Sequence, residues 1–508
     1  MLRRLTRAVR QQAVTRPPHR ERYSLDWLRR FLPHHCPTPF GRLHRELAAD
    51  IAHAAEARDQ RRNYRAPRGS AKTTVGTVGH ALHAAVEGRE PFTLLLSESG
   101  DVAATFLAAI KTELADNAEL AAAYPDAVGV GPVWKGDHVV LRNGCCVMTR
   151  GSLGRVRGLK HGPHRPSLVI MDDPNEKGDA YSPTTRRRKL EWVAKDVMSV
   201  GGPGTNFFSF GTPLHREAIV CDLARNGAWQ TRAYRAVERW PDRPDLWDAW
   251  ERLVHNLADP DRLETARRYY EANRPSMDAG AAVLWPERHP LYALQLQRAT
   301  IGRAAFGCEQ DDQPGTPGAT EWPAEWFDRP GFWFDRWPED LVTVVQSLDP
   351  SKGADARTSD FQAHVRLGLG RDGNLYFEAD LRHDDPEAMA TRALDLAREV
   401  VPHVLVAEVN ATMGLLTPVF QRQLAERAQA GRPQLFRYEE LTSRDAKAAR
   451  VRQVGGYLGT GRVRVRNTPG GRLLADQWRD WPNGEFDDGP DAAGVAVRRL
   501  EMLVNEGR

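Results

Sequence analysis

Short apolar runs separated by amphipathic segments make up the first half of the chain. Mostly apolar runs at residues 92–97, 168–171 and 206–210 predict buried strands. Apolar residues recur at helical spacing in residues 41–57 and 101–114, which predicts amphipathic helices there. Strands that alternate with helices are typical of an α/β domain, so we expect a sheet of largely parallel strands.

A second α/β pattern fills the end of the chain, in a different order. Three strand patterns come first, and a helix, a strand and two helices follow. The predicted elements are strands at 342–348, 361–369 and 375–381, a helix at 386–400, a strand at 404–409, a helix at 414–430 and a last helix from Asp491. This is the order of elements in a ribonuclease H-like domain.

The length of 508 residues exceeds what one hydrophobic core usually organises. We expect a basic N-terminal segment at 1–45, a first α/β domain at 46–240 and a second one at 336–508. Between them, residues 241–335 are rich in Trp, Arg, Asp and Pro, which predicts a helical connector.

Composition narrows the class of protein without naming a function. Hydrophobic residues (41%) and charged residues (27%) are present in ordinary proportions. The net charge of +4 is only a weak indication of a nucleic-acid partner. Five cysteines without CxxC spacing favour a reducing compartment. The sequence has no apolar run of membrane-spanning length and no signal-peptide pattern, so we expect an intracellular protein with no membrane partner.

A short basic loop joins a predicted strand ending near Pro67 to a predicted helix at 73–86. Phosphate binding needs converging backbone N–H groups at a helix start and a cation that reaches the terminal phosphates. The loop offers these parts, although Ala71 replaces the usual glycine and Arg68 replaces the leading one. We therefore predict an ATP site. Its nucleotide-binding residues are Arg68, Gly69, Ser70, Ala71, Lys72, Thr73 and Thr74.

Two carboxylates follow the apolar strand at 168–171. Asp172 is placed to hold the Mg²⁺ that accompanies ATP, and we count it with the nucleotide-binding residues. Asp173 or Glu176 would orient the attacking water, and the sequence leaves this choice open. Gly211-Thr212-Pro213 follows another strand and is typical of a segment that senses the terminal phosphate.

Two further basic segments lie near these acids. Arg155 and Arg157, in a glycine-containing loop, are candidates for an arginine finger or for DNA contacts, or belong to a solvated loop. We interpret Arg186-Arg187-Arg188-Lys189 as the exposed face of a helix.

The second half carries acids at strand ends and at a helix start. Two-metal phosphodiester cleavage needs carboxylates that hold two hard divalent ions. Asp349 and Glu408 end two predicted strands, and Asp487, Asp488 and Asp491 lie at the start of the last helix. These five acids predict a site for two Mg²⁺ or Mn²⁺ ions, with Asp349, Glu408 and Asp488 as the catalytic acids. Which of the last three aspartates binds metal stays open.

Together, these motifs resemble the large terminase subunit of tailed bacteriophages over residues 40–497. The matching motifs are Arg68-Gly69-Ser70-Ala71-Lys72-Thr73-Thr74, Asp172-Asp173-Pro174, Gly211-Thr212-Pro213-Leu214-His215, Asp349-Pro350-Ser351 with Ser359-Asp360, Ala407-Glu408-Val409-Asn410, and Phe486-Asp487-Asp488 with Asp491. The basic stretch from Arg444 to Arg450 is also similar and would contact DNA phosphates. The resemblance implies an α/β chain with an N-terminal P-loop (ASCE-type) ATPase domain and a C-terminal ribonuclease H-like nuclease domain.

The resemblance also implies a function and partners. The family hydrolyses ATP to move double-stranded DNA into a procapsid and cuts concatemeric DNA. Its partners are a small terminase subunit, a portal protein and DNA, and it forms a homo-oligomeric ring when docked, in the host cell cytoplasm. Two alternatives stay open: a helicase-like or defence ATPase–nuclease without a capsid partner, and a catalytically dead DNA-binding scaffold of prophage origin.

Overall fold

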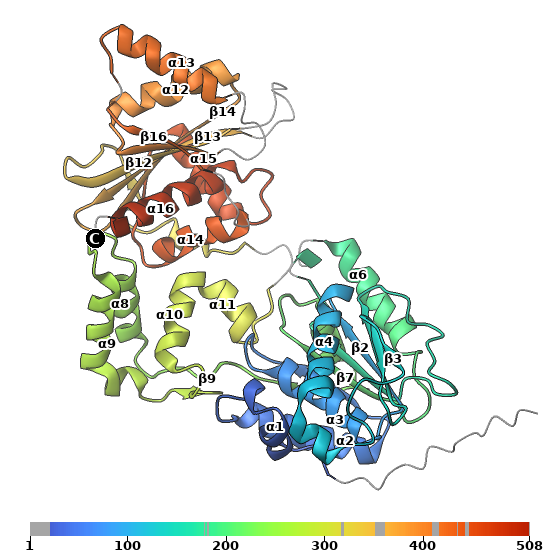
Figure 1. Cartoon of the computed structure of the whole chain (residues 1–508). Helices are drawn as coiled ribbons and strands as arrows, with labels where there is room; N and C mark the ends of the chain where they lie inside the picture. The colour runs from blue at the N-terminus through green and yellow to red at the C-terminus, as the bar shows by residue number, and fades with distance from the viewer. Residues whose placement is uncertain are drawn as a thin grey trace, which may run out of the picture. The chain divides into compact units, whose positions relative to one another are not determined.

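The computed structural model describes residues 21–506, except 177, 180–181, 316–319, 351–360, 409–415, 434 and 442–446. The basic segment before residue 21, Asp360, Asn410 and Arg444 therefore lie outside the described residues. Within the described part, no helix is both long and apolar enough to cross a membrane. The chain divides into two compact units (Figure 1). Unit 1 comprises Met1–Arg239, Ala282–Leu294 and Gly307–Pro317, and unit 2 comprises Trp240–Ala281, Gln295–Phe306 and Gly318–Arg508.

Unit 1 is built on an eight-stranded sheet with the order β3-β4-β5-β2-β6-β7-β1-β8. Strands β5, β2, β6, β7, β1 and β8 follow one another in the sheet, and each pairs in parallel with the next. At the other edge, β3 pairs antiparallel with β4, and β4 pairs antiparallel with β5. The strands are β1 (Arg61–Arg65), β2 (Phe92–Ser97), β3 (Val133–Trp134), β4 (His138–Val140), β5 (Cys146–Gly151), β6 (Leu168–Asp172), β7 (Asn206–Gly211) and β8 (Gln230–Ala233). A separate pair joins β9 (Val237–Arg239) to β10 (Ala282–Val283).

Helices cover both faces of this sheet because alternate strand residues point to opposite sides. Leu95 and Ile170 belong to one core, and their neighbours Leu94 and Val169 belong to the other. The first core includes α1 (Leu25–Phe31), α2 (Arg42–Ala57), η2 (Thr73–Gly79), α3 (His80–Val86), α4 (Gly100–Asp116) and α5 (Ala118–Ala123). The second includes α6 (Pro183–Trp192), η4 (Val193–Val197) and α7 (Ile219–Arg225).

The strand order of unit 1 brings four loops to one edge of the sheet. β1 pairs with β7, β7 with β6, and β6 with β2, all in parallel. The loops that leave these strands therefore begin side by side. In open α/β sheets, ligands bind at the carboxyl ends of the strands. The predicted ATP-site residues follow the strands at this edge.

Unit 2 contains a seven-stranded sheet with the order β11-β17-β14-β13-β12-β15-β16. Strands β12, β13 and β14 form an antiparallel meander, and β15 and β16 continue the sheet in parallel with β12. The strands are β11 (Trp333–Phe334), β12 (Leu341–Asp349), β13 (Gln362–Gly370), β14 (Leu375–Arg382), β15 (Val404–Glu408), β16 (Arg437–Leu441) and β17 (Val463–Arg466). Asp349 and Glu408 therefore end adjacent parallel strands.

Two groups of helices cover the two faces of this sheet (Figure 1). One face packs against α12 (Pro386–Glu399) and α13 (Leu416–Gln429), and the other against α14 (Lys447–Gly459), α15 (Pro469–Asp480) and α16 (Asp488–Glu506). The buried hydroxyl of Ser347 on β12 donates to the carbonyl of Ala492 on α16 at 2.7 Å. This bond fixes the start of α16 against the strand that ends in Asp349. The remaining helices are α8 (Pro244–Val254) and α9 (Arg262–Asp278) in unit 2, and α10 (Leu291–Ile301) and α11 (Arg303–Gln310).

The mixed α/β class with parallel strands is confirmed, and two local expectations need correction. The helix expected at 73–86 begins as the π-helix η2 and becomes α-helical only at His80. The last helix begins at Asp488, one turn before Asp491. Helix α9 contains Pro275, three residues before its last residue, Asp278. Proline has no backbone N–H, so Pro275 cannot donate the hydrogen bond that another residue would donate to the preceding turn.

Candidate active sites

The phosphate-loop candidate runs from β1 into η2 and turns through two left-handed residues. Gly69 has φ +76° and Ala71 has φ +57°. The second value explains why glycine is the usual residue at the position of Ala71, because a Cβ is strained in that conformation. The imidazoles of His44 and His289 contact the carbonyls of Ser70 and Gly69, at 2.9 and 3.2 Å. These contacts fix the loop that precedes the free N–H groups of the helix start.

The lysine of this loop lies between two other predicted site segments. The Nζ of Lys72 is 3.0 Å from Oδ2 of Asp173 and donates to the hydroxyl of Thr212 at 3.2 Å. Asp173, with φ +42°, also accepts the backbone N–H of Thr212 through Oδ1 at 2.9 Å. The structure thus brings together one residue from each of the three predicted motifs of unit 1. Arg68 is half exposed and lies 3.7 Å from Glu309.

Asp172 is buried at the end of β6, and one of its carboxylate oxygens has no partner. Oδ2 accepts the hydroxyl of Thr77 at 2.7 Å, whereas Oδ1 is buried without a hydrogen bond among the described residues. Burial, and then the neighbouring Asp173, raise the pKa of Asp172 to about 6, against the effect of Lys72. An orphaned buried carboxylate oxygen beside a lysine and hydroxyls fits a Mg²⁺ site.

The segment after Asp173 is held by a buried ion pair that the sequence analysis missed. The Nζ of Lys189 on α6 lies 2.8 Å from Oδ2 of Asp179, and both side chains are 4% exposed. Arg186 is also buried and contacts the carbonyl of Asp179 at 3.2 Å and the carboxylate of Glu217. The interpretation of this basic run as an exposed face is therefore wrong for Arg186 and Lys189. These two side chains position the loop that carries Glu176, which is itself exposed.

Glu98 is a further acid at the same edge, and the sequence analysis did not single it out. It directly follows β2, which pairs with β6 so that Leu96 lies beside Met171. Burial, followed by the charges of Glu176 and Asp173, raises the pKa of Glu98. The available signal was its position, since Glu98 ends a buried strand as Asp172 does. Of the candidate arginines, Arg155 is exposed, and Arg157 pairs with Asp196.

Three acids of unit 2 form one compact group. Asp349, Glu408 and Asp491 each offer a carboxylate oxygen, and these atoms lie within 4.8 Å of one another. Burial raises the pKa of Asp349 well above its usual range, and the charges of Asp491 and Glu408 add to the effect. Like charges held this closely are not all ionised unless cations balance them. The donor set, oxygen only, suits the hard ions Mg²⁺ and Mn²⁺.

Two cations of α14 lie against these acids. Arg450, with a side chain 6% exposed, donates to both oxygens of Asp491 at 2.8 and 2.7 Å and lies 3.3 Å from Oε1 of Glu408. Lys447 lies 2.6 Å from Asp487 and 3.7 Å from Asp491. The expectation that the basic stretch faces DNA is wrong for Arg450, because that side chain is buried among the acids.

The other two aspartates of the last motif have different surroundings. Asp488 is buried, and its Oδ2 accepts the backbone N–H of Phe361 at 2.9 Å. Asp487 has a side chain 38% exposed and is paired with Lys447. The helix start at Asp488 puts the side chain of Asp491 one turn further along, beside Asp349 and Glu408. Among the described residues, the compact group therefore includes Asp491 and not Asp487 or Asp488.

Comparison with known proteins finds similar solved structures but no sequence match. No family model matches the chain, and no curated protein sequence matches it. Among solved structures, the chain is similar to the crystal structure of the HK97 bacteriophage large terminase, with a TM-score of 0.32 and 13% sequence identity. The similarity covers 93% of this chain and 98% of that chain. We therefore base the functional assignment on the side chains of the two sites.

Proposed function

We propose that this chain is a large-terminase-like DNA-packaging enzyme that hydrolyses ATP in unit 1 and cuts DNA in unit 2. The observation that carries the proposal is the compact group of Asp349, Glu408 and Asp491 in unit 2. In unit 1 of the same chain, the phosphate-loop lysine Lys72 pairs with Asp173, which follows a strand end. Unit 1 would be the P-loop ATPase domain of the ASCE type. Unit 2 would contain the ribonuclease H-like nuclease domain. Its antiparallel meander, followed by the parallel strands β15 and β16, supports this proposal.

In unit 1, the backbone N–H groups at the start of η2 would bind phosphate oxygens, with the side chains of Lys72 and Arg68. Thr73 and Asp172 would hold the Mg²⁺, which neutralises phosphate charge when bound. Lys72 has to leave Asp173 to reach a phosphate. Thr212, which touches both residues, would then respond to that movement.

Glu98, Asp173 and Glu176 are the three candidates for the acid that orients the attacking water. Asp173 is occupied by Lys72 and by the N–H of Thr212. Glu98 lies at the end of the neighbouring strand, and its raised pKa suits a group that accepts a proton. We therefore favour Glu98 as the general base, with Asp173 as the group that positions Lys72 before ATP binds.

In unit 2, Asp349, Glu408 and Asp491 would hold two Mg²⁺ or Mn²⁺ ions. When bound, such ions activate water and stabilise the leaving oxygen of the phosphodiester. Arg450 orients Asp491 through two hydrogen bonds and Glu408 through an ion pair. Lys447 is the more exposed cation at this site and would donate to a phosphate oxygen of the DNA. Asp488 would fix the chain at Phe361, and Asp487 would hold Lys447.

The proposed partners are double-stranded DNA, a small terminase subunit and a portal protein, with a homo-oligomeric ring formed at the procapsid in the host cell cytoplasm. A helicase-like or defence enzyme would use the same two sites without a capsid partner. Stimulation of ATP hydrolysis by portal-bearing procapsids would support packaging. Strand separation of a forked duplex, without any response to procapsids, would support the helicase-like alternative.

The two activities can be separated by reciprocal variants. Supercoiled plasmid, ATP and Mg²⁺ or Mn²⁺ are incubated with wild type, Lys72→Ala or Asp349→Ala, and cutting and phosphate release are measured in the same tubes. We expect Lys72→Ala to lose ATP hydrolysis alone and Asp349→Ala to lose cutting alone. Lys111→Ala and Asp116→Ala, which change a lysine and an exposed acid of α4, serve as matched controls.

Each outcome has a definite reading. Cutting that survives in Asp349→Ala would show that the metal site is elsewhere. Loss of both activities in either variant would show that the two units do not carry separate sites. A wild-type chain that neither cuts nor hydrolyses ATP, even with procapsids present, would support the catalytically dead scaffold.

A further inference from the structure

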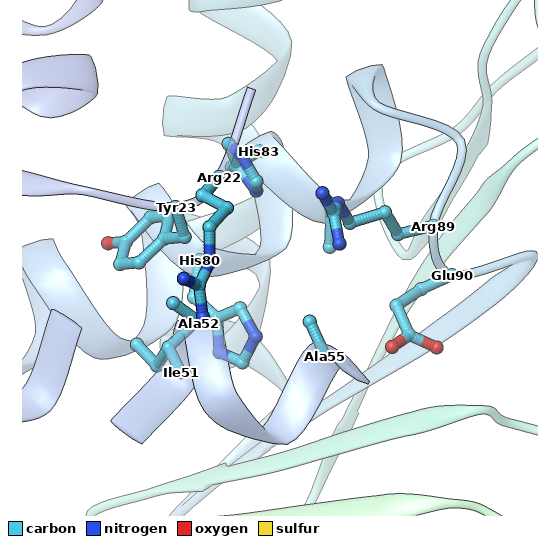
Figure 2. Close-up of a pocket in the computed structure, with 10 residues that line it drawn as sticks. Arg22, Tyr23, Ile51, Ala52, Ala55, His80, His83, Arg89 and Glu90 are labelled. Carbon is cyan, nitrogen blue, oxygen red and sulfur yellow. The ribbon is translucent and has the colours of Figure 1, made fainter. Parts of the chain in front are cut away.

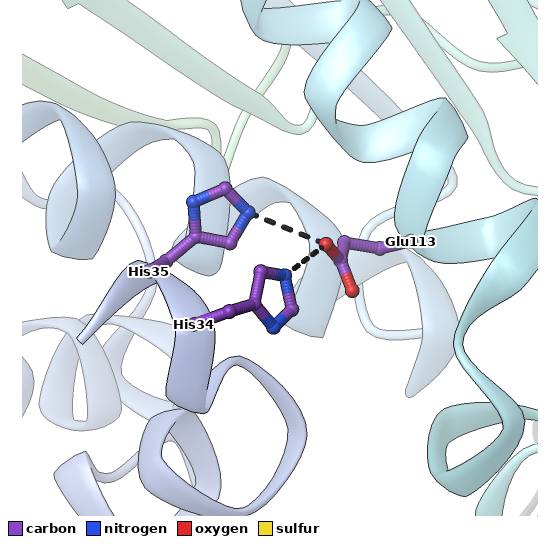
Figure 3. A group of neighbouring side chains, drawn as sticks. All are labelled: His34, His35 and Glu113. Carbon is purple, nitrogen blue, oxygen red and sulfur yellow. Dashed lines mark hydrogen bonds and ion pairs between the residues drawn. The ribbon is translucent and has the colours of Figure 1, made fainter. Parts of the chain in front are cut away.

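Two histidines and a glutamate of unit 1, none of them among the acids described above, meet in one group (Figure 3). His34 and His35 are consecutive residues of the short 3₁₀ turn η1 (Pro33–His35), and Glu113 lies in α4. The Nε2 atoms of His34 and His35 are 2.7 and 3.3 Å from the same Oε1 atom of Glu113. The three side chains thus present their donor atoms to one point.

Glu113 is a buried carboxylate held in a fixed orientation. Its side chain is 4% exposed, and its second oxygen, Oε2, accepts the amide of Asn117 at 2.7 Å. The same amide donates to the carbonyl of Phe31 at 2.6 Å. Metal-binding side chains are commonly oriented by such an outer hydrogen-bond partner. Oε1 is left to face the two imidazoles.

No lysine or arginine lies beside the Glu113 carboxylate among the described residues. Within the described residues, its ion-pair partners are His34 and His35, with no lysine or arginine among them. A buried carboxylate is costly without a counter-charge. A divalent ion between the three donor atoms would balance it.

We propose that His34, His35 and Glu113 bind a divalent transition-metal ion, of which Zn²⁺ fits best. Two imidazole nitrogens and one carboxylate oxygen are a donor set that suits Zn²⁺. Ligands about 2.0–2.1 Å from tetrahedral Zn²⁺ lie roughly 3.3 Å apart. The contact of His35 already has this spacing, and the His34 side chain, 56% exposed, has room to open its shorter contact. The oxygen-only acids of unit 2 select harder ions instead.

The bound ion would fasten the N-terminal segment of the described chain to α4. That segment is already attached at Tyr23, whose hydroxyl donates to the carbonyl of Val75. Figure 2 shows Tyr23 beside His80 at a cavity of about 10 Å³, which has room for no more than one water. The metal would attach the other end of α1, and its fourth ligand position would face solvent.

Metal titration of the full chain tests this proposal. The chelator-treated protein is titrated with Co²⁺, and the visible d–d absorption of a four-coordinate site is recorded, with Zn²⁺ added in competition. We expect one Co²⁺ site that Zn²⁺ displaces and that excess Mg²⁺ does not. His34→Ala and His35→Ala should each weaken binding by about 100-fold or more, since loss of an outer partner alone costs 10–100-fold.

Three further variants make the result decisive. His53→Ala removes an exposed histidine of α2 and should leave the Co²⁺ spectrum unchanged. Asp349→Ala changes the acid group of unit 2 and should also leave it unchanged. Glu113→Gln keeps the shape of the side chain and should weaken binding as the histidine variants do. Binding that is unaffected in both histidine variants, or that is lost in Asp349→Ala, would overturn the proposal.

Discussion

The ammonium group of Lys72 lies 3.0 Å from Oδ2 of Asp173, so the lysine of the phosphate loop is already paired with a carboxylate. The side chain of Lys72 is 7% exposed, whereas that of Asp173 is 41% exposed. A phosphate that binds Lys72 has to displace this carboxylate. The ion pair therefore competes with nucleotide, so its removal should lower the KM for ATP.

Asp173→Asn should lower the KM for ATP by about 2- to 5-fold, because a partly exposed ion pair is worth about 0.2–1 kcal/mol. The asparagine oxygen can still accept the N–H of Thr212, so the turn after β6 should persist. Steady-state ATP hydrolysis measures the effect, with Asp222→Asn, an exposed acid paired with Arg225, as control. An increased KM would contradict competition between Asp173 and phosphate.

Glu98→Gln should lower kcat for ATP hydrolysis by about 100-fold or more, because the amide cannot accept the proton of the attacking water. Its KM should change little. Glu176→Gln, which alters an exposed acid of the adjoining loop, is the matched variant and should keep most of the activity. The opposite ranking of the two kcat values would assign the base to Glu176.

Ala71→Gly should stabilise the protein by about 0.5–1 kcal/mol, because φ +57° strains an alanine and suits a glycine. Ala108→Gly, at an exposed position of α4, should destabilise it by about the same amount. Urea unfolding of both variants gives the two free-energy changes. Equal destabilisation by both would show that the left-handed turn is not strained.

Arg450→Met should destabilise metal-free unit 2 by about 3–5 kcal/mol, because it leaves buried carboxylates without their cation. Mn²⁺ should restore much of this loss, so that it raises the Tm of the variant more than that of wild type. Arg499→Met is the control, since Arg499 is similarly buried but pairs with Glu439, outside the metal group. If Mn²⁺ raised the Tm of the two variants equally, Arg450 would not belong to the metal site.

The raised pKa of Asp172 predicts a pH dependence in the ligand-free protein. A folded-state pKa of about 6, above the ordinary 3.8, means that the folded state binds the proton more tightly. The stability contributed by this group is present at low pH and is lost as the pH rises from about 4 to about 6. Asp172→Asn should flatten the profile of Tm against pH in this window. An unchanged slope would show that other groups cause the pH dependence of Tm.

Strand positions could be predicted from the sequence because both sheets bury their strands on two faces. Mostly apolar runs such as 168–171 and 206–210 correspond to β6 and β7 within one residue at each end. Apolar runs at 168–171, 342–348 and 404–409 likewise placed Asp172, Asp349 and Glu408 at strand ends. Strand order was not readable from these patterns, and strand order is what sets Glu98 beside the acid of β6.

Charged side chains were harder to predict, because burial of a charge depends on partners outside its own helix. Lys189 is buried because Asp179 pairs with it, and Arg450 because Asp491 and Glu408 do. A basic run at helical spacing has the same appearance whether or not such partners exist. The boundary of α16 was also hard to predict. Because the helix starts at Asp488, it is Asp491 that lies beside Asp349 and Glu408 at the strand ends.

The division of the chain has a practical consequence for anyone who wishes to produce one unit alone. Ala282–Leu294 and Gly307–Pro317 return to unit 1 after the chain has entered unit 2. A truncation after Arg239 would remove β10, the partner of β9, and Glu309, whose carbonyl accepts the N–H of Arg68 at 2.8 Å. Expression of unit 1 therefore calls for these segments to be spliced back in, and a simple N-terminal fragment would expose an incomplete phosphate loop.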